Sequence, residues 1–194
     1  MRKILERSFI GVIVLIMAIM VSYFIFKINT KSYSPEDTVT YQKDGLSLEV
    51  FYNRPYKKDR QIFGGLVPFD QVWRTGANEA TTFTTTKDIL VDGSLLPEGK
   101  YTLWTIPMED TWKVIFNSEM YPWGITANEV PFRVADYDVL TIEVDVTPLD
   151  EVVEQFTISF TEAYNFVMLN LAWDKTMISI PIKDAEKVQR VRSR

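Results

Sequence analysis

Residues 8–26 form a run of nineteen residues without a charged side chain, SFIGVIVLIMAIMVSYFIF. A helix of this length rises roughly 28 Å, close to the thickness of the hydrocarbon core of a bilayer. A cleaved signal peptide is the alternative, but its apolar region is usually about 7–15 residues long and ends in small residues. This run is longer and ends in bulky side chains before Lys27. The sequence therefore predicts an uncleaved transmembrane anchor over 8–26, with the membrane as its partner.

The basic residues on either side of this run indicate its orientation. Three basic side chains and the amino terminus precede it within residues 1–7, whereas two lysines, Lys27 and Lys31, follow it. The positive-inside rule then places the short basic end in the cytoplasm. We expect a single-pass protein of the inner (cytoplasmic) membrane with a periplasmic or otherwise extracytoplasmic domain. Residues 27–37, KINTKSYSPED, predict a polar tether between the anchor and that domain.

Beyond the tether the hydrophobic period is two, which is typical of strands with one buried face. Strands at nearly regular spacing, separated by Gly, Pro and Asp, indicate an antiparallel sheet protein. We predict an all-β domain over 38–183, an antiparallel β-sandwich or flattened barrel of nine or ten strands. The alternation is clearest in LSLEVFY (46–52), TIEVDV (141–146), FTISFT (156–161) and VMLNLAW (167–173).

Turn residues set the expected connections between these strands. Asp-Gly pairs at 44–45 and 92–93 predict tight hairpins, because both residues tolerate a positive φ. The pair Asp174-Lys175, between two alternating runs, predicts a further hairpin. Residues 184–194 form a basic C-terminal tail, either helical or frayed.

The chain contains no cysteine and no histidine, and these absences exclude much common chemistry. They rule out disulfides, a thiol nucleophile, a thiolate zinc site, a histidine general base and a Ser-His-Asp triad. A metal would need a site made only of oxygen ligands. No stretch has the ligand spacing of a known calcium loop, so we predict no metal and no cofactor.

The net charge of −5 is distributed unevenly along the chain. Residues 1–7 sum to +2 and residues 183–194 sum to +3, which leaves −10 for the part between them. Phosphate contacts need a basic face, and an acidic body lacks one. We therefore predict that nucleic acid is not a partner.

The stretch VWRTGANEAT, residues 72–81, is the strongest candidate for a site. One interpretation is structural: Arg74 and Glu79 form an ion pair that locks a loop onto the sandwich, with Asn78 tying the loop. The other is a polar site in which Arg74 anchors an anion, Glu79 acts as acid or base, and Trp73 forms a wall. Residue types alone leave both open.

Two further stretches point toward binding. RPYKKDR, residues 54–60, places four cations, Arg54 and Arg60 among them, against one anion in an otherwise acidic domain. It would attract a carboxylate or phosphate, or else form a solvated loop. Trp123 lies in MYPWGIT, a loop flanked by Pro and Gly, where exposed aromatic residues tend to serve recognition.

Taken together, RPYKKDR, IFGGLVP, VWRTGANEAT, LPEGKYTLWTIP, WKVIFN and the late WDKT at 173–176 carry a resemblance. They resemble a bacterial family known as domain of unknown function 2911, over nearly everything after the tether. The resemblance implies an envelope-located β-rich protein with no established activity. Family members are expected to carry a cleavable or lipoprotein signal, from which this chain departs with its anchor. Its motif residues are site candidates here: Arg54, Arg60, Trp73, Arg74, Gly76, Asn78 and Glu79.

These observations support two main hypotheses. The first is a membrane-anchored binding or scaffold module whose loops hold an anionic small molecule, a glycan or an envelope partner. The alternative is a carboxylate-dependent hydrolase that uses Glu79 with a second carboxylate and is oriented by Arg74. A third possibility is a purely structural element of a larger envelope complex.

Overall fold

The computed structural model describes residues 2–187 of the chain, with side chains from Phe9 onward. It consists of two units, a helix that ends at Tyr33 and a β domain that begins at Ser34, and each is described by itself. Of the predicted basic tail, the residues up to Lys187 are described and start a helical turn. The rest of that tail lies outside the described residues.

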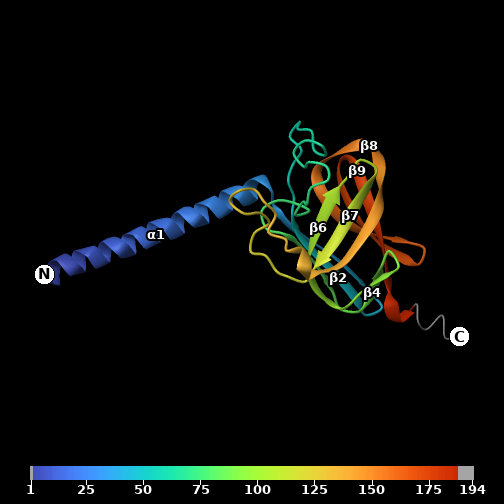
Figure 1. Ribbon diagram of the computed structural model, residues 1–194, viewed down its shortest axis with the longest axis horizontal. Coiled ribbons are helices and arrows are strands. Elements are labelled where there is room, and N and C mark those ends of the chain that lie inside the picture. The colour runs from blue at the N-terminus through green and yellow to red at the C-terminus, as the bar shows by residue number, and fades with distance from the viewer. Residues whose placement is uncertain (1, 188–194) are drawn as a thin grey trace. The chain divides into compact units, whose positions relative to one another are not determined.

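The first unit is α1, Arg2–Tyr33, which contains the whole predicted anchor (Figure 1). Within Phe9–Tyr33 the mean hydropathy reaches 2.8, and the side chains of this apolar stretch are not buried. By length and composition α1 is therefore able to cross a membrane. A signal sequence near an amino terminus has the same length and composition. The residues predicted as a tether, 27–37, are divided between the end of α1 and the first strand, which begins at Glu36.

The second unit contains nine strands within the described residues, and each is antiparallel to its neighbours. Their hydrogen-bonded order is β1-β2-β3-β6-β7-β8-β9-β4-β5. The strands are β1 (Glu36–Lys43), β2 (Leu46–Asn53), β3 (Thr81–Thr85), β4 (Ile89–Val91), β5 (Ser94–Leu96), β6 (Gly99–Pro107), β7 (Thr111–Asn117), β8 (Asp138–Ala163) and β9 (Phe166–Asp184).

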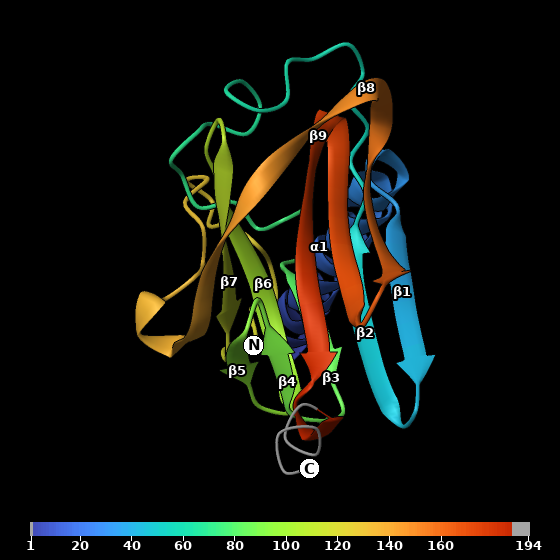
Figure 2. The same ribbon diagram turned by 90° about the vertical axis from the view of Figure 1, so that its right-hand side faces the viewer.

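The long strand β8 takes part in both layers of the domain. Its first part, up to Asp145, pairs with β7, and from Val146 onward it pairs with β9. Its register shifts between Pro148 and Thr157, and such irregularities bend a strand. Figure 2 shows β8 crossing from the side of β7 to the side of β9. The prediction of an antiparallel sandwich or flattened barrel after one apolar N-terminal helix is therefore confirmed.

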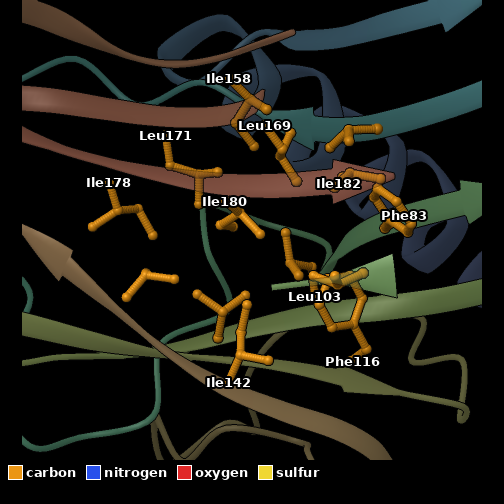
Figure 3. Packing of buried hydrophobic residues seen from close by; sticks show 14 of the residues in the cluster. Phe83, Leu103, Phe116, Ile142, Ile158, Leu169, Leu171, Ile178, Ile180 and Ile182 are labelled. Carbon is orange, nitrogen blue, oxygen red and sulfur yellow. The ribbon is translucent and has the colours of Figure 1, made fainter. Parts of the chain in front are cut away.

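The core lies between the two layers, because alternate side chains of facing strands point inward. In β2 the inward positions are buried and the residues between them are more exposed, as a period of two requires. Burying one such side chain stabilises the fold by about 1.5–3 kcal/mol, and the core has to suffice without disulfides. Figure 3 shows the packing of Phe83, Leu103, Phe116, Ile142, Ile158, Leu169, Leu171, Ile178, Ile180 and Ile182.

The turn predictions are confirmed. The Asp-Gly pairs at 44–45 and 92–93 form tight hairpins, with positive φ at all four residues. The hairpin predicted at Asp174-Lys175 lies inside β9, where Asp174 has a φ of 54°. The two arms of β9 fold back on each other, so that Ser179 Oγ donates to Asn170 Oδ1 at 2.7 Å and Lys183 Nζ lies 3.8 Å from the centre of the Phe166 ring (Figure 2).

Candidate functional site

The segment that carries the candidate residues 73–79 is fixed to the edge of β6. Trp73 exchanges two backbone hydrogen bonds with Thr105, at 2.7 and 3.0 Å. The indole Nε1 of Trp73 donates to the carbonyl of Gly76 at 3.1 Å, and the hydroxyl of Thr81 donates to the carbonyl of Thr75 at 2.6 Å. Backbone groups of a loop need partners when buried, and these bonds provide them. The segment is therefore an ordered loop of defined shape.

Trp73, expected to form a wall of a polar site, packs in the core instead. Its ring is stacked on that of Trp173, with centroids 5.9 Å apart, and meets Trp112 and Phe156 edge to face. Each such aromatic pair adds about 0.5–1.5 kcal/mol beyond burial. The packing of Trp73 thus holds the neighbouring Arg74 at a fixed place on the surface of the domain.

The buried residue Asn53 joins the loop to the end of β2, and sequence reasoning missed it. Its Nδ2 donates to Glu79 Oε2 at 3.2 Å, and its Oδ1 accepts a hydrogen bond from Asn78 Nδ2 at 3.3 Å. Gly76, with a φ of 150°, lies so close that an added Cβ would stand 2.8 Å from the carbonyl oxygen of Asn53. The one local signal for Asn53 is its position directly before Arg54-Pro55, at the end of a strand.

Arg74 lies beneath the loop that connects β7 to β8. An added Cβ on Gly124 would stand 2.1 Å from Arg74 Cδ and 2.9 Å from Arg74 Cβ. The backbone N–H of Gly124 donates to the carbonyl of Asn78 at 2.9 Å, and that of Phe132 donates to the carbonyl of Gly124 at 3.2 Å. The aliphatic part of Arg74 is therefore clamped between its own loop and the covering one.

The guanidinium of Arg74 is partly buried and makes no ion pair within residues 9–187, so the predicted pair with Glu79 is not formed. Its Nε is buried without a hydrogen-bond acceptor. Burial lowers the pKa of Arg74 below its usual value, and the charge of Glu129 only partly opposes this. A polar atom that is buried without a hydrogen-bond partner is unfavourable, so the Nε of Arg74 carries a cost in the domain as it stands.

Arg54 pairs with a carboxylate and donates hydrogen bonds within the β domain. Its Nη1 lies 3.1 Å from Asp37 Oδ2 in β1, while its Nε and Nη2 donate to Phe156 and Thr157 in β8. Arg54 thus connects the edge of one layer to a strand of the other. An ion pair that is partly exposed, like this one, contributes about 0–1 kcal/mol.

Arg60 caps its own loop. Its Nε donates to the carbonyl of Lys57 at 2.9 Å, and its Nη2 donates to the carbonyl of Tyr56. Lys57 in turn lies 2.9 Å from Asp174 Oδ2 in β9. Arg54 and Lys57 therefore reach β8 and β9, whereas Arg60 binds its own loop. None of these contacts involves the loop around Arg74.

Trp123 is half-buried and precedes Gly124, the residue that covers Arg74. The segment from this loop to the start of β8 exposes several large apolar side chains. These side chains, in the loop and at the start of β8, are Met120, Val130, Phe132, Val134, Tyr137 and Val139.

A comparison with family models finds one match, described as a protein of unknown function (DUF2911), over residues 34–182. The match begins where α1 ends and covers the β domain through most of β9. No curated protein and no solved structure matches the chain.

Proposed function

Because the chain belongs to the DUF2911 family of proteins of unknown function, its membership brings no activity with it, and we propose that it is a membrane-anchored binding module. Its site is centred on Arg74, and its ligand is an anionic small molecule, an acidic glycan or an acidic envelope partner. In this proposal α1 stays in the inner membrane and the β domain works on the extracytoplasmic side. The basic residues before the apolar run support this orientation.

The observation that carries the proposal is the state of the Arg74 guanidinium. It is partly buried, and its Nε has no acceptor within the described residues. A carboxylate or phosphate can accept two parallel hydrogen bonds from a guanidinium, which is the strongest arrangement for such a pair. An anion that reaches the guanidinium beneath the covering loop would therefore relieve a cost that the free protein bears.

The loop is also organised before any ligand arrives. Gly124 holds the stem of Arg74 in one place, so little side-chain freedom remains to be lost on binding. Thr75 has a φ of 57°, in the left-handed region that a β-branched residue rarely adopts. Strained backbone of this kind is concentrated at ligand-binding and active sites. Both features support a built site.

The hydrolase hypothesis has less support. It needs Glu79 to act with a second carboxylate across a cleft. Glu79 Oε2 accepts a hydrogen bond from the buried amide of Asn53, which supports a role in holding the loop. The third hypothesis, a purely structural element, leaves the unpartnered Nε of Arg74 without an explanation.

The test uses the full-length protein in nanodiscs of phosphatidylcholine. Its melting temperature is measured with inorganic phosphate and with galacturonate, against chloride at equal ionic strength. An anion that binds only the folded state raises the melting temperature. We expect a rise for the wild type and for Arg60→Gln, a matched control, and none for Arg74→Gln. Equal rises in wild type and Arg74→Gln would overturn the proposal.

A second arm separates a protein partner from a small anion. Wild-type and Arg74→Gln proteins are used to capture partners from detergent-solubilised membranes of the producing bacterium. A partner recovered with the wild type and lost with Arg74→Gln identifies an acidic protein ligand. A response to phosphate or galacturonate without such a partner identifies a small anion or glycan.

A further inference from the structure

A cavity of about 550 Å³ opens at the end of the β domain where the β1–β2 turn, the β8–β9 turn and the end of β9 meet. Small-molecule pockets range from about 300 to 1,000 Å³, and mouths of β-barrels are common places for them. Buried apolar residues that line it are Leu46, Val167 and Ile182. We call this cavity, with its aromatic neighbours Tyr41 and Phe166, the hairpin cleft.

The hairpin cleft is separate from the site at Arg74. It includes Leu46 at the start of β2, whereas the loop of Arg74 is tied to Asn53 at the end of β2. Seven residue steps along a strand span roughly 23 Å. A ligand in the cleft would therefore be independent of a ligand at Arg74.

Both carboxylates that line the hairpin cleft have cationic partners. Glu162 accepts hydrogen bonds from Lys43 Nζ at 2.8 Å and from the hydroxyl of Tyr41 at 2.9 Å. Asp184 lies 3.4 Å from Lys87 Nζ. The negative charges of the cleft are thus already neutralised by the protein.

One lysine that lines the cleft takes part in no ion pair within residues 9–187. Lys187 pairs with Asp44 at 2.7 Å, at the exposed rim. Lys183 Nζ instead lies 3.8 Å from the centre of the Phe166 ring, and no ion pair within residues 9–187 includes it. An ammonium on an aromatic face keeps its positive charge available to a further partner. The cleft therefore has one uncompensated positive charge beside an apolar floor.

We propose that the hairpin cleft binds a small amphipathic monoanion, an aromatic or branched-alkyl carboxylate. Its carboxylate pairs with Lys183, and its apolar body packs on Leu46, Val167 and Phe166. The one lysine outside these ion pairs matches a single negative charge. A second negative charge on the ligand would find no further unpaired cation among the lining residues that the structure describes, because Lys43 and Lys187 already pair with Glu162 and Asp44.

The test uses ¹⁹F NMR on the full-length protein in phosphatidylcholine nanodiscs, with 4-(trifluoromethyl)benzoate as the probe. Empty nanodiscs measure the probe that partitions into lipid. We expect saturable binding to the wild type, and binding weakened about three- to fivefold by Lys183→Gln, since a partly exposed ion pair contributes up to about 1 kcal/mol. Lys113→Gln, an exposed lysine on β7, is the matched control and should bind as the wild type does.

Two further measurements keep the result interpretable. Phe166→Ala removes a partly exposed wall of the cleft and should also weaken binding, while the neutral 4-(trifluoromethyl)benzamide should bind more weakly than the benzoate. Benzoate bound in the cleft is weakened by Lys183→Gln and kept by Arg74→Gln, whereas benzoate bound at Arg74 shows the opposite pattern, so this proposal and the one at Arg74 fail separately. Binding no greater than to empty nanodiscs, or equal binding by wild type and Lys183→Gln, would overturn the proposal.

Discussion

The hydroxyl of Tyr52 on β2 accepts a hydrogen bond from the backbone N–H of Ile158 on β8 at 2.9 Å and faces the carbonyl of Ile158 at 3.4 Å. Tyr52 is fully buried, and its ring meets that of Phe156 edge to face. The phenol of Tyr52 thus connects β2, in one layer, to Ile158 in the part of β8 that belongs to the other layer.

Tyr52→Phe should lower the free energy of unfolding by about 1–3 kcal/mol, because it leaves the buried N–H of Ile158 without an acceptor. Urea denaturation followed by tryptophan fluorescence measures this difference. Tyr137→Phe, at an exposed tyrosine, is the matched control and should be nearly neutral. Equal stability of Tyr52→Phe and the wild type would show that the bridge contributes nothing.

The same tyrosine predicts a pH dependence. Burial raises the pKa of Tyr52 above its ordinary value near 10, because the charged phenolate is disfavoured inside the domain. The resulting stability is fully present below about pH 10 and is lost as the pH rises through the folded-state pKa. We expect Tyr52→Phe to lose less stability than the wild type as the pH rises above about 10. Parallel stability curves for the two proteins would contradict this assignment.

The contact between Gly124 and Arg74 predicts a compensating pair of substitutions. Gly124→Ala places a methyl group against the stem of Arg74 and should cost about 1–3 kcal/mol of unfolding free energy. Arg74→Ala removes Cγ and the nearest obstructing atom, Cδ, and leaves only Cβ close by, so the double variant should be more stable than the sum of the two changes predicts. Strict additivity in a double-mutant cycle would mean that the covering loop moves away from the added methyl group without a cost in stability.

The hydrogen bonds of Asn53 to Asn78 and Glu79 predict that its loss makes the loop of residues 73–79 more mobile. Asn53→Ala leaves the amide of Asn78 and the carboxylate of Glu79 without the bonds that Asn53 makes with them, at a cost of about 1–3 kcal/mol. Hydrogen exchange of the loop amides should become faster than in the wild type. Asn128→Ala, in an exposed loop, is the control and should leave exchange in the loop 73–79 unchanged.

The anchor is tested by the fate of α1. We expect the mature chain to retain its amino terminus by mass spectrometry and to stay in the membrane pellet after alkaline carbonate extraction. Ile16→Arg, near the middle of the apolar run, should reduce insertion, because an arginine there costs about 2.5–3.5 kcal/mol. A soluble protein trimmed near Lys27 would show that α1 is a cleaved signal.

The sequence predicts those parts of this protein that have local causes. Alternation in β2 and the Asp-Gly pair at 44–45 are readable because a strand's face and a tight turn depend on adjacent residues. Asp174 marks the turn inside β9 for the same reason, because its φ of 54° lies in the left-handed region that such turns require. The pairing of Asp174 with Val153, where the register of β8 shifts, depends on a distant strand and is not readable from local sequence.

The sites depend still more on distant residues. The motif around Arg74 drew attention to the right segment, but the cover from Gly124 and the support from Asn53 come from other parts of the chain. The hairpin at Asp174-Lys175 accounts for the meeting of Lys183 and Phe166, but the cleft as a whole also needs the β1–β2 turn, which comes from a distant part of the chain.

The sharing of β8 between the layers has a consequence for turnover in the cell. Neither layer can detach as an independent half, since each would take part of the same continuous strand with it. The domain should therefore offer proteases no long-lived half-folded form. Its degradation would then follow how often the whole domain opens at once, rather than the loosening of any single edge.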